Sequence, residues 1–563
     1  MDKQNIRLFF LFALFLVGMF LYNSWQQEQQ LKQAPITITK TITKTSTKTS
    51  NVDKDSLPAI PGANSSPAKS VEIFGDNGTQ KVDARRIINV STDVFNMKID
   101  ALGGDIVYLD LPKYTEKLQE PDKGFVLLDE SSDRFYVVQS GLLNELGPDS
   151  NANGRALYSF ASNDVVMEEG ESVLNVDLNY VTRNGVKITK RFVLTRDSYI
   201  IRLHYLVDNK SSSNYQASSF GRIKRRAPQK ESSGFFGGGM KTYTGAAINT
   251  PETKYKKLPF ADMASKPFKE DVRGGWVAMV EHYFASALVP SSEEKNYYQT
   301  ETFGEDVYAV RFVSAPEIIV PGAQKQIEIK LYAGPEIAKQ LKELAPGLEL
   351  TIDYGMLWFL CQPIFGLLKI MYDFLANWGL AIIATTIIIK GLFYKLSASS
   401  YKSMGNMRKL QPKIETLKQR CGEDKQKFSQ EMMALYKKEK VNPLGGCLPI
   451  LVQIPVFIAL YYVLLECVEL RQAPFMLWIH DLSAKDPYYV LPLIMGASMF
   501  VQQRLNPTPP DPIQAKVMMF MPVFFTFLFL QFPSGLVLYW VVNNLLSILQ
   551  QWYITRKIEK AGK

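Results

Sequence analysis

The chain has 563 residues, 46% of them hydrophobic, and carries 64 Lys and Arg against 55 Asp and Glu. This length and composition exclude a small single domain and a disordered polymer. The hydrophobic residues are unevenly spread, because the sequence is polar and β-patterned until about residue 350 and continues in long uncharged blocks. We therefore expect a membrane protein with a large aqueous domain.

The N-terminal segment 1–25 predicts a transmembrane anchor. Lys3 and Arg7 precede a stretch that is uncharged from Leu8 to Gln27. No small-x-small cleavage pattern follows its apolar centre, so a retained anchor is favoured over a cleaved signal peptide. The basic flank places the N-terminus in the cytoplasm.

Residues 26–70 predict a flexible linker, because large apolar groups are rare and threonine recurs at every second position from Thr37 to Thr49. Residues 71–350 predict a β-sandwich domain. In this region apolar and polar residues alternate from Leu174 to Tyr180, and Asn184-Gly185 precedes a second run. This pattern indicates an antiparallel hairpin.

Segment 234–242, which reads Gly-Phe-Phe-Gly-Gly-Gly-Met-Lys-Thr, resembles a phosphate-binding loop. In such a loop the lysine directly follows the last glycine, so that backbone amides and the ammonium converge on the phosphates. Here Met240 stands between them. We therefore expect a mobile loop instead of a nucleotide site.

The C-terminal part predicts an interfacial amphipathic helix and five spans. Trp358, Lys369 and Asp373 suit the level of the lipid headgroups. The uncharged stretch from Val517 to Thr555 is about twice the roughly 20 residues that one helix needs, and a Pro-Ser-Gly turn divides it. We expect the interfacial helix at 351–376 and the spans, TM2 to TM6, at 377–397, 443–466, 487–504, 516–532 and 535–554.

The charges of the loops predict the orientation of these spans. The segment 399–442 carries eleven basic and five acidic residues, and the tail 555–563 is also basic. The segment from Glu466 to Asp486 carries two basic and four acidic residues, so the loop 467–486 lies on the other side. We expect a multi-pass membrane protein with both termini in the cytoplasm; in a bacterium it would lie in the inner membrane, with residues 26–350 in the periplasm.

The segment 399–442 predicts a cytoplasmic helical hairpin, because apolar residues recur at helical spacing on both sides of Cys421-Gly422. Its polar face is strongly basic, which suits anionic lipid, ribosomal RNA or acidic proteins. A merely solvated face is the alternative. The apolar residues are Met404, Met407, Leu410, Ile414, Leu417, Phe428, Met432 and Leu435.

Lys390 is the main candidate for a functional residue, because it lies within the predicted span 377–397. An ammonium at this depth costs roughly 2.5 to 3.5 kcal/mol unless it faces water or a partner. Snorkelling toward the cytoplasmic surface is the alternative. Thr386 lies one turn earlier on the same face, and further polar groups could wet a shared cavity or join helices. These groups are Gln453, Gln503, Asn543 and Asn544.

No acid/base pair, activated nucleophile or metal cluster accompanies Lys390 in the spans, which disfavours an enzyme. The cysteines and histidines also lack metal-ligand spacing, so we expect packing or surface roles and no cofactor. A small-solute transporter and an envelope scaffold stay open. The residues concerned are Cys361, Cys421, Cys447, Cys467, His204, His282 and His480.

Several motifs resemble the membrane core of the YidC/Oxa/Alb family of membrane protein insertases. They are Asn-Pro-Leu-Gly-Gly-Cys-Leu-Pro at 442–449, Gln-Ile-Pro at 453–455, Pro-Tyr-Tyr at 487–489 and Phe-Pro-Ser-Gly-Leu-Val-Leu-Tyr-Trp at 532–540. The resemblance covers about residues 353 to 557. The anchor and the large β-domain are similar to the Gram-negative form of the family.

The resemblance implies an insertase and chaperone that acts on nascent membrane proteins, alone and with the Sec translocon. It implies a hydrophilic groove that is open to the cytoplasm and lipid, with a cation at Lys390, where most members carry arginine. It also implies contacts of the outer domain with accessory subunits of the translocon. Ribosomes would meet the basic hairpin and tail, and no DNA partner is implied. The implied client-binding residues are Lys390, Thr386, Gln453, Gln503 and Trp540.

Overall fold

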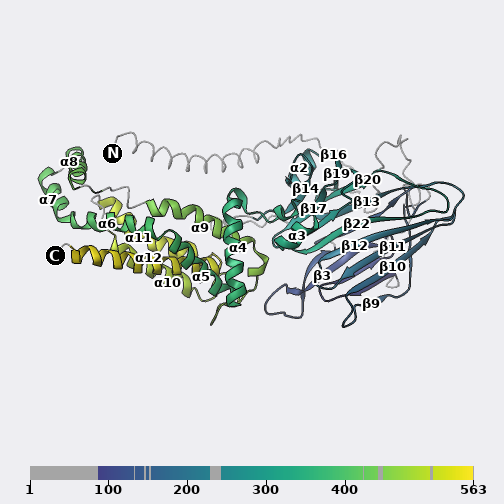
Figure 1. Cartoon of the computed structure of the whole chain (residues 1–563), viewed down its shortest axis with the longest axis horizontal. Helices are drawn as coiled ribbons and strands as arrows, with labels where there is room; N and C mark the ends of the chain where they lie inside the picture. The colour runs from purple at the N-terminus through teal and green to yellow at the C-terminus, as the bar shows by residue number, and fades with distance from the viewer. Residues whose placement is uncertain are drawn as a thin grey trace, which may run out of the picture. The chain divides into compact units, whose positions relative to one another are not determined.

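The computed structural model describes residues 86–131, 133–144, 147–150, 154–228, 242–422, 424–439, 441, 448–506 and 512–561. The predicted anchor 1–25, the linker 26–70 and all but the last residue of the glycine-rich segment 234–242 lie outside the described residues. The described chain divides into an N-terminal β-rich part and a C-terminal helical part (Figure 1). This division agrees with the change of patterning near residue 350.

The β-rich part contains two large sheets, and nearly all strand pairs in them are antiparallel. The first sheet has the order β16 (Lys269–Arg273), β19 (Lys295–Phe303), β20 (Val307–Ser314), β13 (Tyr215–Arg226), β5 (Tyr136–Leu143), β4 (Gly124–Asp129), β3 (Asp105–Thr115), β2 (Asn96–Asp100), β1 (Ile87–Ser91) and β9 (Asp164–Val166). The short strands β21 (Glu317–Ile319), β6 (Asp149–Ser150) and β7 (Gly154–Arg155) join it beside this path.

The second sheet has the order β15 (Lys256–Leu258), β14 (Gly245–Asn249), β17 (Trp276–Glu281), β18 (Phe284–Val289), β22 (Gln324–Pro335), β12 (Ile200–Asn209), β11 (Val186–Thr195), β10 (Val173–Val181) and β8 (Ser159–Phe160). Side chains of the first sheet reach the second: Tyr136 on β5 donates to the Met279 carbonyl at 3.3 Å. The two sheets therefore pack face to face as a sandwich.

The predicted hairpin is confirmed as β10 and β11. The strands pair antiparallel from Val173 opposite Thr195 to Val181 opposite Lys187. Apolar side chains of β10 such as Leu174 are buried while Asn175 is exposed, as alternation predicts. Gly185 takes a φ of 85° in the turn, a conformation that side chains other than glycine rarely adopt.

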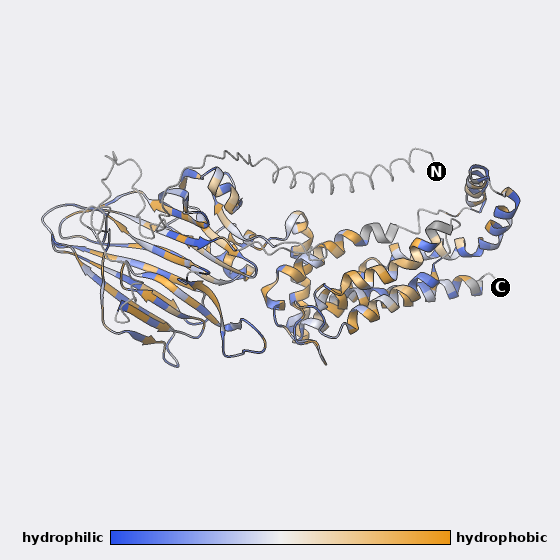
Figure 2. Ribbon diagram, turned by 180° about the vertical axis from the view of Figure 1, so that it is seen from behind, coloured by the Kyte–Doolittle hydropathy of each residue, from blue (hydrophilic) through white to orange (hydrophobic). Residues whose placement is uncertain are grey.

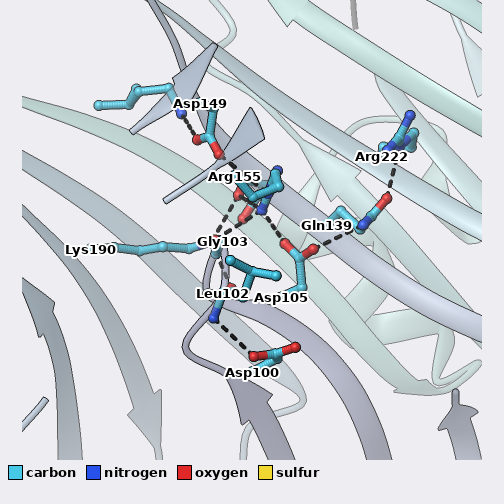
Figure 3. Close-up of polar contacts among 12 residues, drawn as sticks. Asp100, Leu102, Gly103, Asp105, Gln139, Asp149, Arg155, Lys190 and Arg222 are labelled. Carbon is cyan, nitrogen blue, oxygen red and sulfur yellow. Dashed lines mark hydrogen bonds and ion pairs between the residues drawn. The ribbon is translucent and has the colours of Figure 1, made fainter. Parts of the chain in front are cut away.

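A buried lysine joins the two sheets. Lys190 on β11 is fully buried and donates to three backbone carbonyls of the first sheet (Figure 3). The acceptors are Gly103 at 3.0 Å, Gly104 at 2.7 Å and Ser140 at 2.9 Å. Three acceptors match the three N–H groups of an ammonium, so the charge is solvated by the backbone instead of by water.

Arg155 extends this buried polar cluster. Its guanidinium pairs with Asp105 and also with Asp149, where the two atoms lie 3.2 Å apart (Figure 3). Gln139 donates to Asp105 at 2.9 Å and accepts from Arg222 at 2.9 Å. Opposite charges thus lie together between the sheets, which is the arrangement that buried charges require.

Two short helices and two 3-10 turns close the β-rich part. They are α2 (Phe260–Ser265), α3 (Ala338–Leu344), Leu348–Thr351 and Gly355–Leu357. The helical part then consists of α4 (Trp358–Leu375), α5 (Trp378–Leu392), α6 (Tyr394–Lys409), α7 (Gln411–Cys421), α8 (Lys425–Lys438), α9 (Leu448–Glu466), the 3-10 turn Val468–Leu470, α10 (Val490–Leu505), α11 (Pro512–Phe529) and α12 (Ser534–Ala561).

Two of the predicted helices are divided in the structure. The predicted span 377–397 is not one straight helix, because α5 and α6 are bent by 68° at Phe393. The predicted first helix of the hairpin is divided into α6 and α7 at Leu410. Pro412 lies at the start of α7, where its missing N–H costs nothing and its ring keeps α6 from continuing.

Helices α7 and α8 lie against each other in the segment of the predicted hairpin. Lys413 on α7 pairs with Glu439, directly after α8, at 2.6 Å. The apolar stripe residues Ile414 and Phe428 are half-buried, while Lys418 and Lys427 are exposed. Figure 2 shows hydrophilic residues gathered on α7, α8 and the C-terminal end of α12, in contrast to the largely hydrophobic α5, α9 and α11.

One helical segment of the described residues, Gly355–Leu375, is long and apolar enough to cross a membrane by length and composition. The bent pair α5 and α6 meets the same criterion if it counts as one span, and Gln453–Glu466 and Ala515–Phe529 are shorter apolar helices. Large apolar side chains on α11, such as Phe520 and Val523, are about 60% exposed. A soluble surface rarely exposes a contiguous group of this kind, whereas lipid would cover it.

Close packing of α10 against α11 depends on Gly496. A Cβ atom at this position would overlap Oγ1 of Thr526 on α11, which itself donates to the Pro522 carbonyl at 2.7 Å. Small residues let membrane helices approach closely. The two helices therefore have no room for a side chain here.

We expect Gly496→Leu to destabilise the helical part by roughly 1–3 kcal/mol, because the added side chain forces α10 and α11 apart. Thermal denaturation of the purified full chain in detergent measures this. Gly366→Leu on α4 is the matched control, because a Cβ there meets nothing within 4 Å. Equal denaturation temperatures for the two variants would contradict the prediction.

Candidate groove of the helical core

The Lys390 side chain is held in the last turn of α5. This helix begins after Asn377, whose side chain accepts a hydrogen bond from the Leu380 N–H at 3.0 Å and so caps the helix. Lys390 is half-buried, and its Nζ donates to Oδ1 of Asn543 on α12 at 3.0 Å. Among the described residues, Nζ meets this amide oxygen and forms no ion pair with a carboxylate.

The same amide oxygen accepts a second hydrogen bond. Nε2 of Gln453 on α9 also donates to Oδ1 of Asn543. An ammonium can only donate, so the oxygen of the Asn543 amide has to face Lys390, and Gln453 then has to present its NH₂ group. This arrangement joins α5, α9 and α12 at a single atom.

A small cavity of about 20 Å³ adjoins Lys390. That volume suffices for about one water molecule, and the polar lining offers it partners. Thr386 also lines the cavity, although its hydroxyl donates to the Ile382 carbonyl of its own helix at 2.6 Å. The lining residues are Thr386, Ile389, Lys390, Phe393, Leu396, Ser397, Gln453, Val456, Tyr539 and Asn543.

A second cavity of about 500 Å³ shares Gln453 and Asn543 with the first. Its other walls are mostly apolar and include four methionines, from α6, α10 and α11. Methionine is flexible and polarizable, so such a wall adapts to different apolar shapes. The methionines are Met404, Met499, Met518 and Met521, and further lining residues include Gln503, Phe457, Phe525 and Trp540.

Trp540 contributes a fixed aromatic wall to the second cavity. Its ring contacts Phe457 edge-on at 4.7 Å between centroids and Phe529 at 5.3 Å. Its buried indole Nε1 finds no hydrogen-bond partner within the described residues. This N–H group is therefore available to an acceptor that enters the cavity.

A row of polar side chains on α12 extends from the cavities toward the C-terminus. Asn544 donates to Ser498 on α10 at 3.0 Å, and Ser547 donates to the Asn543 carbonyl at 2.7 Å. Gln550 donates to the Tyr394 carbonyl at 3.1 Å, and Gln551 to Oδ1 of Asn506 at 3.0 Å. These bonds join α12 to α6, to α10 and to Asn506, the residue directly after α10.

All five residues that the resemblance implies meet at these two cavities. Lys390 and Thr386 line the first, Gln503 and Trp540 line the second, and Gln453 lines both. Sequence analysis did not predict the methionine wall. The only available signal was the apolar stripe of the hairpin for Met404, whereas the other three methionines lie in uniformly apolar segments. No group of three or more His, Cys, Asp or Glu that could hold a metal ion occurs in the described ranges.

Comparison with known families assigns both parts of the chain. The family model described as YidC periplasmic domain matches residues 87–367, and the one described as 60Kd inner membrane protein matches residues 370–561. The β-sandwich thus matches a periplasmic domain of this family, and the helical part matches an inner membrane protein.

Individual relatives are similar in sequence over nearly the whole length of this chain. The membrane protein insertase YidC of Pseudomonas entomophila (strain L48) is 52% identical over 90% of this chain and 91% of its own length. The same insertase of Pseudomonas fluorescens (strain SBW25) is 48% identical over 98% of this chain and 97% of its own. The chain belongs to the YidC family of membrane protein insertases, and it is a membrane protein insertase.

A solved structure of an active YidC insertase, with its first transmembrane domain resolved, is also similar. The two chains are 20% identical, and the matched region covers 83% of this chain and 92% of the chain in that structure, with a TM-score of 0.37.

Proposed function

We propose that the two adjoining cavities form one client-binding groove, in which Lys390, Thr386, Gln453, Gln503 and Trp540 contact the client. The observation that carries this proposal is the position of Lys390. Its ammonium lies among apolar helices, pairs with a neutral amide and stands beside a large apolar cavity. Such a site can receive a peptide whose ends differ in character, one acidic and one apolar.

The mechanism follows from the cost of burying charge. An acidic or polar flank of a nascent segment is expensive in hydrocarbon, and it enters the groove because Lys390 attracts it. The apolar stretch of the client meets the methionine wall and Trp540, and it then passes to lipid along the exposed apolar face of α11. Hydrophobic partitioning makes insertion favourable. The membrane potential adds about 2.3 kcal/mol per charge per 100 mV for acidic flanks, so no nucleotide is required.

In this proposal the protein crosses the membrane six times, with both termini in the cytoplasm and residues 26–350 in the periplasm. The groove opens to the cytoplasm and to the lipid of the inner leaflet. Helix α4 lies in the interface, which its crossing direction relative to α9 and α12 supports (Figure 1). Lys369 and Asp373, which are more than half exposed, would meet the headgroups.

The partners follow from the distribution of charge. The basic face of α7 and α8, together with the basic tail, would receive ribosomes that carry nascent membrane proteins. The periplasmic sandwich would contact accessory subunits of the Sec translocon, so that insertion proceeds both alone and with the translocon. The protein would also help clients to fold, because an adaptable apolar wall shields them before they reach lipid.

The test is insertion of a short client with an acidic translocated tail, in cells depleted of the native protein. Lys390→Arg is expected to insert this client about as well as wild type, because it retains the charge. Lys390→Ala is expected to lower insertion about tenfold at normal protein levels.

Insertion by Lys390→Ala at the wild-type level would show that the lysine only snorkels to the membrane surface. Uptake of a small solute into vesicles that contain the protein would favour the transporter alternative. Indifference of every client to every Lys390 variant would favour a scaffold.

A further inference from the structure

We propose that Asn543 positions the Lys390 ammonium in the groove and does so without cancelling its charge. The inference rests on the proposed function of the groove and adds a residue that acts through Lys390. Asn543 lies 153 positions along the chain from Lys390, on a different helix, and supplies the acceptor that Nζ meets among the described residues.

The chemistry of the pair favours an amide over a carboxylate. An aspartate at this place would also hold the ammonium, but it would neutralise the charge that an acidic client has to meet. A neutral oxygen fixes the position of Nζ through a hydrogen bond to a charged group, which is stronger than one between neutral groups. The cation therefore stays attractive to a carboxylate of a client.

Asn543 is itself held in place. The residue is 8% exposed, and Oδ1 also accepts from Gln453. Its backbone carbonyl accepts from Ser547 one turn further along α12. Because both lone pairs of Oδ1 are used, rotation of the amide would break two hydrogen bonds at once.

A lysine without this acceptor has an alternative position. Lys390 lies in the last turn of α5, and its flexible stem allows the ammonium to turn away from the groove toward water. The hydrogen bond to Asn543 opposes that movement. Insertion of an acidic client should therefore require that the ammonium and the amide face each other across the cavity. It should depend less on which of the two helices carries the lysine.

The experiment uses the full chain and compares two clients, one with an acidic translocated tail and one whose tail carries Asn in place of Asp. Asn543→Asp and Asn543→Leu are each expected to lower insertion of the acidic client about tenfold relative to the neutral client. Gln551→Glu is the matched control. It introduces a carboxylate two turns further along α12, at a residue that lines neither cavity. It should change the ratio between the clients less than about twofold.

A swap of the two side chains tests position directly. Lys390→Asn should insert the acidic client poorly, because it removes the cation that the client has to meet. The double variant, which also carries Asn543→Lys, should recover to within about threefold of wild type, because the ammonium again faces the amide across the cavity. Protein levels and insertion of the neutral client show whether each variant has folded.

The possible failures are distinct. If Lys390→Asn inserts the acidic client like wild type, the charge at 390 is not used and the proposed function fails. If Lys390→Asn fails but Asn543→Leu inserts like wild type, Lys390 acts without the positioning residue and the inference on Asn543 is overturned. A double variant no better than Lys390→Asn, while it inserts the neutral client normally, would overturn the inference as well.

Discussion

Lys390→Glu is expected to lower insertion of a client with an acidic tail about a hundredfold, because the variant places an anion where the client's anion has to enter. A client with a lysine tail should respond in the opposite direction and insert better with Lys390→Glu than with wild type. This reciprocal result depends on the sign of the charge, which a loss of folding could not reproduce. The measurement is the fraction of client whose tail is protected from, or exposed to, external protease.

Lys369→Glu on α4 is the control for this reversal. Lys369 is about half exposed, pairs with Asp373 at 3.8 Å and lines neither cavity. The substitution changes the net charge of the chain by the same amount as Lys390→Glu. Equal losses for the two variants would mean that the overall charge of the membrane core matters and that the groove does not.

Lys190→Met is expected to destabilise the periplasmic sandwich by about 3–5 kcal/mol. Methionine fits the space, but it leaves the Gly104 carbonyl without its side-chain donor and removes one of the two donors that the Gly103 and Ser140 carbonyls share with Arg155. It also removes one of the cations that balance Asp105 and Asp149. The urea concentration at which protease degrades the domain, measured on the full chain in membranes, reports this loss. Lys187→Met is the control, because Lys187 lies on the same strand and is exposed.

The same lysine should make stability depend on pH. Burial lowers the pKa of Lys190 from its usual 10.5 to about 7, so the buried side chain is an ammonium below this pH and loses its proton above it. Between these two pKa values the unfolded chain binds a proton that the folded chain does not, so stability rises as the pH increases from neutral toward 10. The difference in stability between wild type and Lys190→Met should widen over this range. A constant difference would mean that the lysine keeps its proton in the folded domain.

The parts of the fold that follow local periodicity were predictable from sequence. The alternation along β10 and the turn at Gly185 predicted a hairpin that the structure contains. The uncharged blocks predicted the apolar helices of the C-terminal part. The bend between α5 and α6 was not predicted, because apolar residues continue through Phe393 and no proline or glycine pair marks the break.

Contacts between distant segments could not be predicted from the sequence. Lys190 stands in a strand whose pattern predicts only that it faces the core, and nothing local indicates the carbonyls of Gly103 and Ser140 as its partners. Lys390 was recognised because a charge in an apolar span is costly. Its acceptor was one of several polar residues in other spans, and only the helix packing selects Asn543.

The size of the cavity beside Lys390 bears on how tightly the membrane stays sealed. A space for about one water molecule is too narrow for a hydrated ion, and the ammonium repels cations that approach it. This cavity therefore gives a hydrated sodium ion no path past Lys390. The bacterium would keep the electrical gradient that pulls acidic tails outward, even while many copies of the insertase stand idle.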